Sequence, residues 1–196
     1  DPIDAHDLTF ENLTINYYPG ENEGLVFDFE DMVGHIRFKN VLINLNGGNM
    51  IFRGEGTIDI EFATIISYPV FIEEKLDRNG SGYSGTLYND GPVLNVNHSI
   101  IGFGNMVSFP GTTNFNFCAV QAYEFEGLFE YTNPIEIYYG DWGFVDQSMG
   151  DFHLISTAGY WNSETNSFIS GDYTSPLIDA GDIFYGAGKE IFPNGF

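Results

Sequence analysis

Residues 36–43, Ile-Arg-Phe-Lys-Asn-Val-Leu-Ile, decide the fold of this chain. Apolar and polar residues alternate up to Asn40, and the alternation then resumes after a shift of one residue. Residues 58–65, Ile-Asp-Ile-Glu-Phe-Ala-Thr-Ile, have the same pattern. Alternation is typical of a half-buried strand, and a shift of one residue keeps both halves facing inward only where a corner separates two short strands. The stretch therefore predicts two strands that meet at a corner.

The same pattern recurs along the chain. It begins at residues 8, 36, 58, 94, 115 and 135, and three of the five intervals are 20–22 residues long. A second apolar run follows most copies, for example at residues 25–27, 50–52, 106–107 and 128–129. About three short strands in a repeat of this length form one coil of a parallel β-solenoid, in which each coil buries its apolar side chains against the next. A β-sandwich with irregular hairpins is the alternative that such alternation leaves open.

Composition and charge exclude several classes of protein. Among 196 residues, 28 are acidic and 6 basic, so the formal charge is −22, while 43% are hydrophobic. The apolar content supports a folded core rather than a disordered chain. The acidic surface repels nucleic acid and anionic lipid, and no apolar run is long enough for membrane insertion as a helix. The single Cys118 permits neither an internal disulfide nor a thiolate zinc site, and we expect it to be a buried, inert thiol.

The C-terminal quarter carries a resemblance to a known family. Phe144-Val145-Asp146, residues 150–154 and residues 175–182 (Ser-Pro-Leu-Ile-Asp-Ala-Gly-Asp) resemble the closing segment of secreted right-handed parallel β-helix repeat proteins, the polysaccharide-lyase-like superfamily. The resemblance implies that the predicted all-β solenoid is a right-handed parallel β-helix, and the six copies of the repeat give about six coils over residues 1–149. Residues 150–196 would form the terminal coil and an irregular C-terminal cap of the same domain. The resemblance also implies a secreted or cell-surface protein.

The outward residues of the first strand in each copy define a candidate site. In stacked coils they form ladders with steps of about 4.8 Å. Cross-strand charge compensation is the simpler interpretation of the acidic and basic residues among them. The other interpretation is a polysaccharide groove, because family lyases use Lys, Arg, acids and calcium on this face. The outward pairs are Thr9/Glu11, Arg37/Lys39, Asp59/Glu61, Asn95/Asn97, Asn114/Asn116 and Glu136/Tyr138.

In the lyase interpretation each charged residue has a role. Lys39 would abstract the proton beside a uronate carboxylate, and Arg37 would neutralise that carboxylate. Asp59, Glu61 and Asn95 would hold Ca²⁺ or sugar hydroxyls, and the remaining asparagines (Asn97, Asn114 and Asn116) would extend the binding row.

Calcium is the one cofactor that the charge pattern favours. Asp28, Glu30 and Asp31 are close together in the sequence, and clustered carboxylates relieve their repulsion by binding a hard divalent cation. None of the acidic clusters matches an EF-hand or a nonapeptide calcium repeat, so a solvated acidic surface is the simpler alternative.

The N-terminal end of the solenoid has no predicted cap, because the first coil signal begins at Leu8 and Phe10. An uncovered strand edge invites another strand, so we expect these residues to mediate a homo-oligomer or filament. We carry two hypotheses for function. The first is a non-catalytic extracellular module that is structural, self-associating or carbohydrate-facing. The second is a polysaccharide lyase, or a related carbohydrate-active enzyme, acting on an anionic polysaccharide.

Overall fold

The computed structural model describes most of the chain. The described residues are 7–17, 24–29, 34–67, 86–103, 106–121, 124–135, 142–147, 151–162, 165–178 and 180. They divide into two units, residues 1–134 and residues 135–196. No helix among them is long and apolar enough to cross a membrane.

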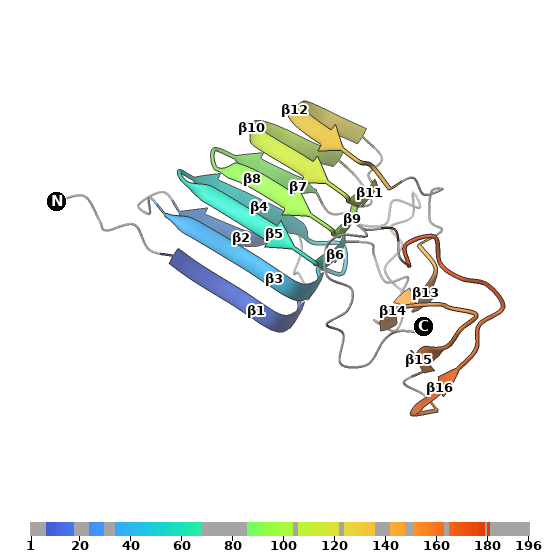
Figure 1. Cartoon of the computed structure of the whole chain (residues 1–196). Helices are drawn as coiled ribbons and strands as arrows, with labels where there is room; N and C mark the ends of the chain where they lie inside the picture. Colours follow the sequence, from blue (N-terminus) through green and yellow to red (C-terminus); the bar gives the residue numbers. More distant parts are fainter. Residues whose placement is uncertain are drawn as a thin grey trace, which may run out of the picture. The chain divides into compact units, whose positions relative to one another are not determined.

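The first unit is one parallel sheet of twelve strands, which lie side by side in Figure 1. All of its strand pairs are parallel. The strands are β1 (Asp7–Asn16), β2 (Gly24–Phe29), β3 (His35–Asn44), β4 (Asn49–Gly54), β5 (Thr57–Glu61), β6 (Thr64–Ser67), β7 (Leu87–Asp90), β8 (Val93–Asn97), β9 (Ile100–Phe103), β10 (Met106–Asn116), β11 (Ala119–Gln121) and β12 (Glu124–Thr132).

These strands form three ladders. In the first ladder, the N-terminal halves of β1 and β3 are followed by β5, β8 and the C-terminal halves of β10 and β12. In the second, β2, β4 and β7 are followed by the N-terminal halves of β10 and β12. In the third, the C-terminal halves of β1 and β3 are followed by β6, β9 and β11. The all-β prediction is confirmed, and the curled parallel sheet is compatible with a solenoid.

The shift in alternation at Asn40 is a corner between the first and third ladders. The six residues at this corner have positive φ angles, from 49° to 55°, although none is glycine. Asparagine tolerates this conformation better than most residues other than glycine, and Asn40 donates a 2.6 Å hydrogen bond to Asn12. In the middle coils, His98 stacks between two phenylalanine rings, with centroid distances of 5.2 and 5.4 Å. The corner residues are Asn12, Asn40, Phe62, His98, Phe117 and Asn133.

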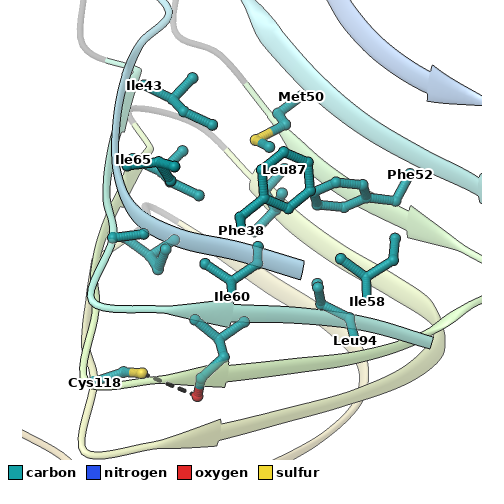
Figure 2. Close-up of a cluster of buried hydrophobic side chains, with 14 of the residues drawn as sticks. Phe38, Ile43, Met50, Phe52, Ile58, Ile60, Ile65, Leu87, Leu94 and Cys118 are labelled. Atoms are coloured by element: carbon teal, nitrogen blue, oxygen red, sulfur yellow. Dashed lines mark hydrogen bonds between the residues drawn. The ribbon is translucent and has the colours of Figure 1, made fainter. Parts of the chain in front are cut away.

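The core lies between the three ladders, as Figure 2 shows. Phe38 comes from the first ladder, Met50 and Phe52 from the second, and Ile43 and Ile65 from the third, and all five are buried. The inward position of each strand therefore faces the other two ladders, which is why the apolar pattern repeats in every coil. Further buried members are Ile36, Ile58, Ile60, Leu87, Leu94, Val96, Ile101, Phe103, Phe115 and Cys118.

The structure corrects the sixth outward pair of the predicted ladder. Glu130 and Thr132, not Glu136 and Tyr138, lie opposite Asn114 and Asn116. The reason is a difference in coil length. Three residues separate Phe109 from Thr113 in β10, but only residue 128 stands between the corresponding parts of β12. The repeat of 20–22 residues therefore does not hold at this coil.

The second unit has two antiparallel pairs. β13 (Phe144–Asp146) pairs with β14 (Asp151–Leu154), and β15 (Tyr160–Asn162) pairs with β16 (Ser167–Ile169). Trp142 is buried, and its carbonyl oxygen accepts a 2.6 Å hydrogen bond from the Ser175 hydroxyl. A cap over residues 150–196 stays a prediction.

Candidate functional site

The outward side chains of the first ladder form two rows. The Arg37 row contains Thr9, Arg37, Asp59, Asn95, Asn114 and Glu130. The Lys39 row contains Glu11, Lys39, Glu61, Asn97, Asn116 and Thr132. The structure thus brings together the residues of the predicted ladder in the order that the sequence predicted for its first five coils. Their roles in binding or catalysis stay predictions.

Hydrogen bonds run along the Arg37 row. Asn114 donates to Asn95 at 2.8 Å, and Asn95 donates to Asp59 Oδ1 at 2.9 Å. The other carboxylate oxygen, Asp59 Oδ2, lies 2.6 Å from His35 Nε2. Both oxygens of Asp59 are therefore engaged by neighbouring coils, so this carboxylate ties three layers of the sheet together.

His35 is the member of this site that sequence reasoning missed. It lies on β3 two residues before Arg37, so both side chains are on the outward face. Its bond to Asp59 is diagonal, because the residue directly opposite His35 on β5 is Thr57. The alternation His35, Arg37, Lys39 was the available signal.

The Lys39 row is paired more loosely. The Lys39 ammonium lies 3.9 Å from Glu11, and the two side chains are 44% and 50% exposed. An exposed pair of this kind contributes about 0–1 kcal/mol. Asn133 donates to Asn116 at 3.1 Å, and Asn116 donates to Asn97 at 3.4 Å. The amides of this row therefore also bond to one another.

Arg37 differs from its neighbours on this face. Its side chain is half-buried, and within the described part of the chain its guanidinium has no ion pair. Asp59, directly opposite in register, bonds to His35 and Asn95 instead. An arginine with free donors can bind a carboxylate or phosphate through two parallel hydrogen bonds. Arg37 is therefore the position on this face best suited to receive an anionic group.

The predicted calcium cluster is only partly described. Asp28 is in β2, opposite Arg53 of β4. Glu30 and Asp31 lie outside the described residues. Within the ranges that are described, no three His, Cys, Asp or Glu side chains converge on one point. Calcium binding stays a prediction.

Replacing Asp59 with alanine tests the hydrogen-bonded row. We expect Asp59→Ala to lower the free energy of unfolding by about 1–2 kcal/mol, because it removes two hydrogen bonds between coils. Glu61→Ala is the matched control. Glu61 is on the same strand and face, and the described residues hold no partner for its carboxylate, so its loss should stay within about 0.5 kcal/mol. Urea unfolding would measure both. Equal losses would mean that the Asp59 bonds add no stability.

The outer edge of β1 is the second candidate surface. Leu8, Phe10 and Leu13 are 41%, 37% and 37% exposed, whereas their partners in β3 (Ile36, Phe38 and Val41) are buried. Phe10 stacks on Phe38 with ring centroids 5.1 Å apart. Among the described strands, β1 pairs only with β3. Among the described residues, the edge thus combines backbone groups that have no strand partner with exposed apolar side chains. A role of Leu8 and Phe10 in self-association stays a prediction.

Cys118 is unsuited to chemistry. Its thiol is buried and donates to the carbonyl oxygens of Val96 and Asn116. Burial raises the pKa of the Cys118 thiol to about 11, although nearby backbone hydrogen bonds act in the opposite direction. The reactive thiolate is therefore scarce at neutral pH.

Comparison with known proteins finds no match to any protein-family model, curated protein or solved structure. The function must therefore be inferred from the two surfaces of this chain: the paired rows on the first ladder and the open edge of β1.

Proposed function

We propose that this chain is a non-catalytic, extracellular β-helix module that associates with copies of itself through the outer edge of β1. The observation that carries the proposal is the exposed apolar edge of the first unit. Its side chains occupy the positions that are buried in the next coil.

The proposed fold is a right-handed parallel β-helix of about six coils, like the family that the C-terminal segment resembles. The three ladders support it. Each contains strands in chain order, and successive strands visit the ladders in rotation. This is the connectivity of a solenoid, and right-handed crossovers are the rule between parallel strands.

The open edge supports self-association. Leu8 and Phe10 point the same way as the core residues Ile36 and Phe38, so a further coil or strand would bury them. An edge strand with apolar side chains and unpaired backbone groups favours pairing with another strand. A second copy supplies such a strand without requiring any other protein.

The paired rows support a structural role. A lyase needs its acidic ligands open to substrate, whereas both carboxylate oxygens of Asp59 are bonded to neighbouring coils. Arg37 is the observation that favours the lyase alternative, because its guanidinium has no ion pair in the described part of the chain. Release of unsaturated products from an anionic polysaccharide, followed by ultraviolet absorbance, would overturn the non-catalytic proposal.

Light scattering over a range of protein concentrations tests self-association. We expect the wild-type chain to form a species larger than 21.9 kDa as concentration rises. Phe10→Ser should weaken the association at least about 30-fold, because truncating a central aromatic of an interface costs about 2 kcal/mol or more. Phe168→Ser is the matched control, since Phe168 is 57% exposed on β16 in the second unit. A wild-type chain that stays monomeric at high concentration, with and without calcium, would contradict the proposal.

A further inference from the structure

The tyrosine of β12 closes one edge of the sheet. The Tyr131 hydroxyl donates to the carbonyl oxygen of Cys118 and accepts from the amide of Val120. The amide of Ala119 points the other way, toward the carbonyl oxygen of Ser99. Tyr131 therefore bonds the outer edge of β11, where the next strand of the third ladder would bind. Burial raises the pKa of Tyr131 to about 12, so the phenol keeps its proton over the physiological range.

This closure bears on how a second copy can bind. β1 belongs to two ladders at once, because residues 7–11 pair in the first and residues 13–16 pair in the third. In a head-to-tail stack, the β1 of one copy would have to extend β12 and β11 of the next copy together. The groups of β11 that it needs are already bonded to Tyr131. In a head-to-tail stack, residues 13–16 of β1 would therefore meet backbone groups of β11 that already have a partner.

Pro134 also hinders the pairing of a further strand at the C-terminal end of the third ladder. It follows the corner residue Asn133, at the position that Leu13 and Val41 occupy in the first two coils. Proline has no amide hydrogen and is excluded from central strands. The C-terminal end of the third ladder is thus closed by one side chain and one proline, whereas the described residues leave the outer edge of β1 open along its length.

We propose that two copies of this chain join through their β1 strands, antiparallel and related by a two-fold axis, to form a closed dimer rather than a filament. The inference rests on the proposed self-association and adds its geometry. An isologous contact uses the same edge on both copies, so it needs no second complementary surface and ends at two subunits.

Charge selects the register of the two β1 strands. If Thr9 lay opposite its own copy, Asp7 of each chain would face Glu11 of the other, and like charges directly opposite are destabilising. If Phe10 lies opposite its own copy, Thr9 faces Glu11, and Leu8 faces the corner residue Asn12. This second register has no opposed acids and brings the two exposed phenylalanines together at the axis.

Engineered cysteines test the dimer and its register. Residues directly opposite in antiparallel strands have Cα atoms about 4.5–5.5 Å apart, within the range of a disulfide. Thr9→Cys/Glu11→Cys should therefore give at least about tenfold more covalent dimer under mild oxidation than either single variant. Both positions face outward, so the apolar edge is retained. Because the Cys118 thiol is buried, we expect it to form few intermolecular disulfides. Non-reducing electrophoresis and light scattering are the readouts.

Thr9→Cys/Glu130→Cys is the matched variant for the other geometry, because these residues end the same row at opposite ends of the first ladder. A series of covalent multimers from this variant would overturn the closed dimer and leave the proposed self-association intact. A covalent dimer from Thr9→Cys alone would overturn the register. A monomer in every variant and in the wild type would overturn both the inference and the proposed function.

Discussion

Replacing Phe38 with alanine is expected to lower the free energy of unfolding by about 3–5 kcal/mol. Phe38 is 1% exposed and belongs to the hydrophobic core of the first unit. Its ring stacks on Phe10 of the preceding coil at 5.1 Å and contacts Phe52 of the second ladder at 6.4 Å. Figure 2 shows it among side chains from all three ladders. Alanine would leave a cavity that rigid strands cannot close, because β3, which carries Phe38, is hydrogen-bonded to β1 on one side and to β5 and β6 on the other.

Urea unfolding followed by circular dichroism measures this loss, with Phe168→Ala as the control. Phe168 is 57% exposed and contacts Trp161 at a ring-centroid distance of 5.5 Å. Its truncation should cost about 1 kcal/mol or less, because it removes one aromatic contact and little buried area. Similar losses for the two variants would mean that the first unit has no close-packed core around Phe38.

The ladders were predictable because their signal is local. Alternation and a shift of one residue at the corner can be read within eight residues, as at residues 36–43. For the first four copies, the registers then follow from aligning the copies, since inward residues must meet inward residues. The five outward pairs from Thr9/Glu11 to Asn114/Asn116 are in the order that the sequence predicted.

The strands that sequence reasoning missed carry polar residues inside. β7 contains Asn89, which is buried and donates to the carbonyl oxygen of Pro92 and the hydroxyl of Thr113. Thr113 is itself a buried, inward residue of the first ladder, so the fifth copy begins at Thr113, two residues before the predicted start at Phe115. A polar residue that is satisfied inside the fold breaks the apolar pattern without breaking the strand.

The bonding within the candidate site could not be predicted from spacing. Register places Arg37 opposite Asp59, which suggests an ion pair between them. In the structure, Asp59 bonds to His35 and Asn95, while Lys39 lies beside Glu11 rather than Glu61. Which neighbour a side chain contacts depends on its rotamer and on competing donors, and neither is visible in a pattern of residue types.

Gly56→Ala is the second substitution from which we expect a large effect, a loss of at least about 3 kcal/mol in the free energy of unfolding. Gly56 follows the second ladder and precedes β5, and its φ angle is +113°. A residue with a Cβ atom rarely adopts this φ angle, and the strained backbone conformation costs about 1–3 kcal/mol. In addition, a Cβ here would overlap the carbonyl oxygen of Gly34 in the neighbouring coil.

The overlap is the decisive part, because the opposing atoms are backbone. The carbonyl oxygen of Gly34 accepts the hydrogen bond from Thr57, so moving it away would break the first bond of β5 to the adjacent layer. Gly159→Ala measures the cost of the positive φ angle without a steric overlap. Gly159 has a φ angle of +128°, but its Cβ would meet no atom closer than 3.9 Å. Thermal melts of both variants should therefore show a clearly larger loss for Gly56→Ala. Equal losses would mean that the coils can move apart at the turn between β4 and β5 without cost. That result would contradict close stacking of the coils.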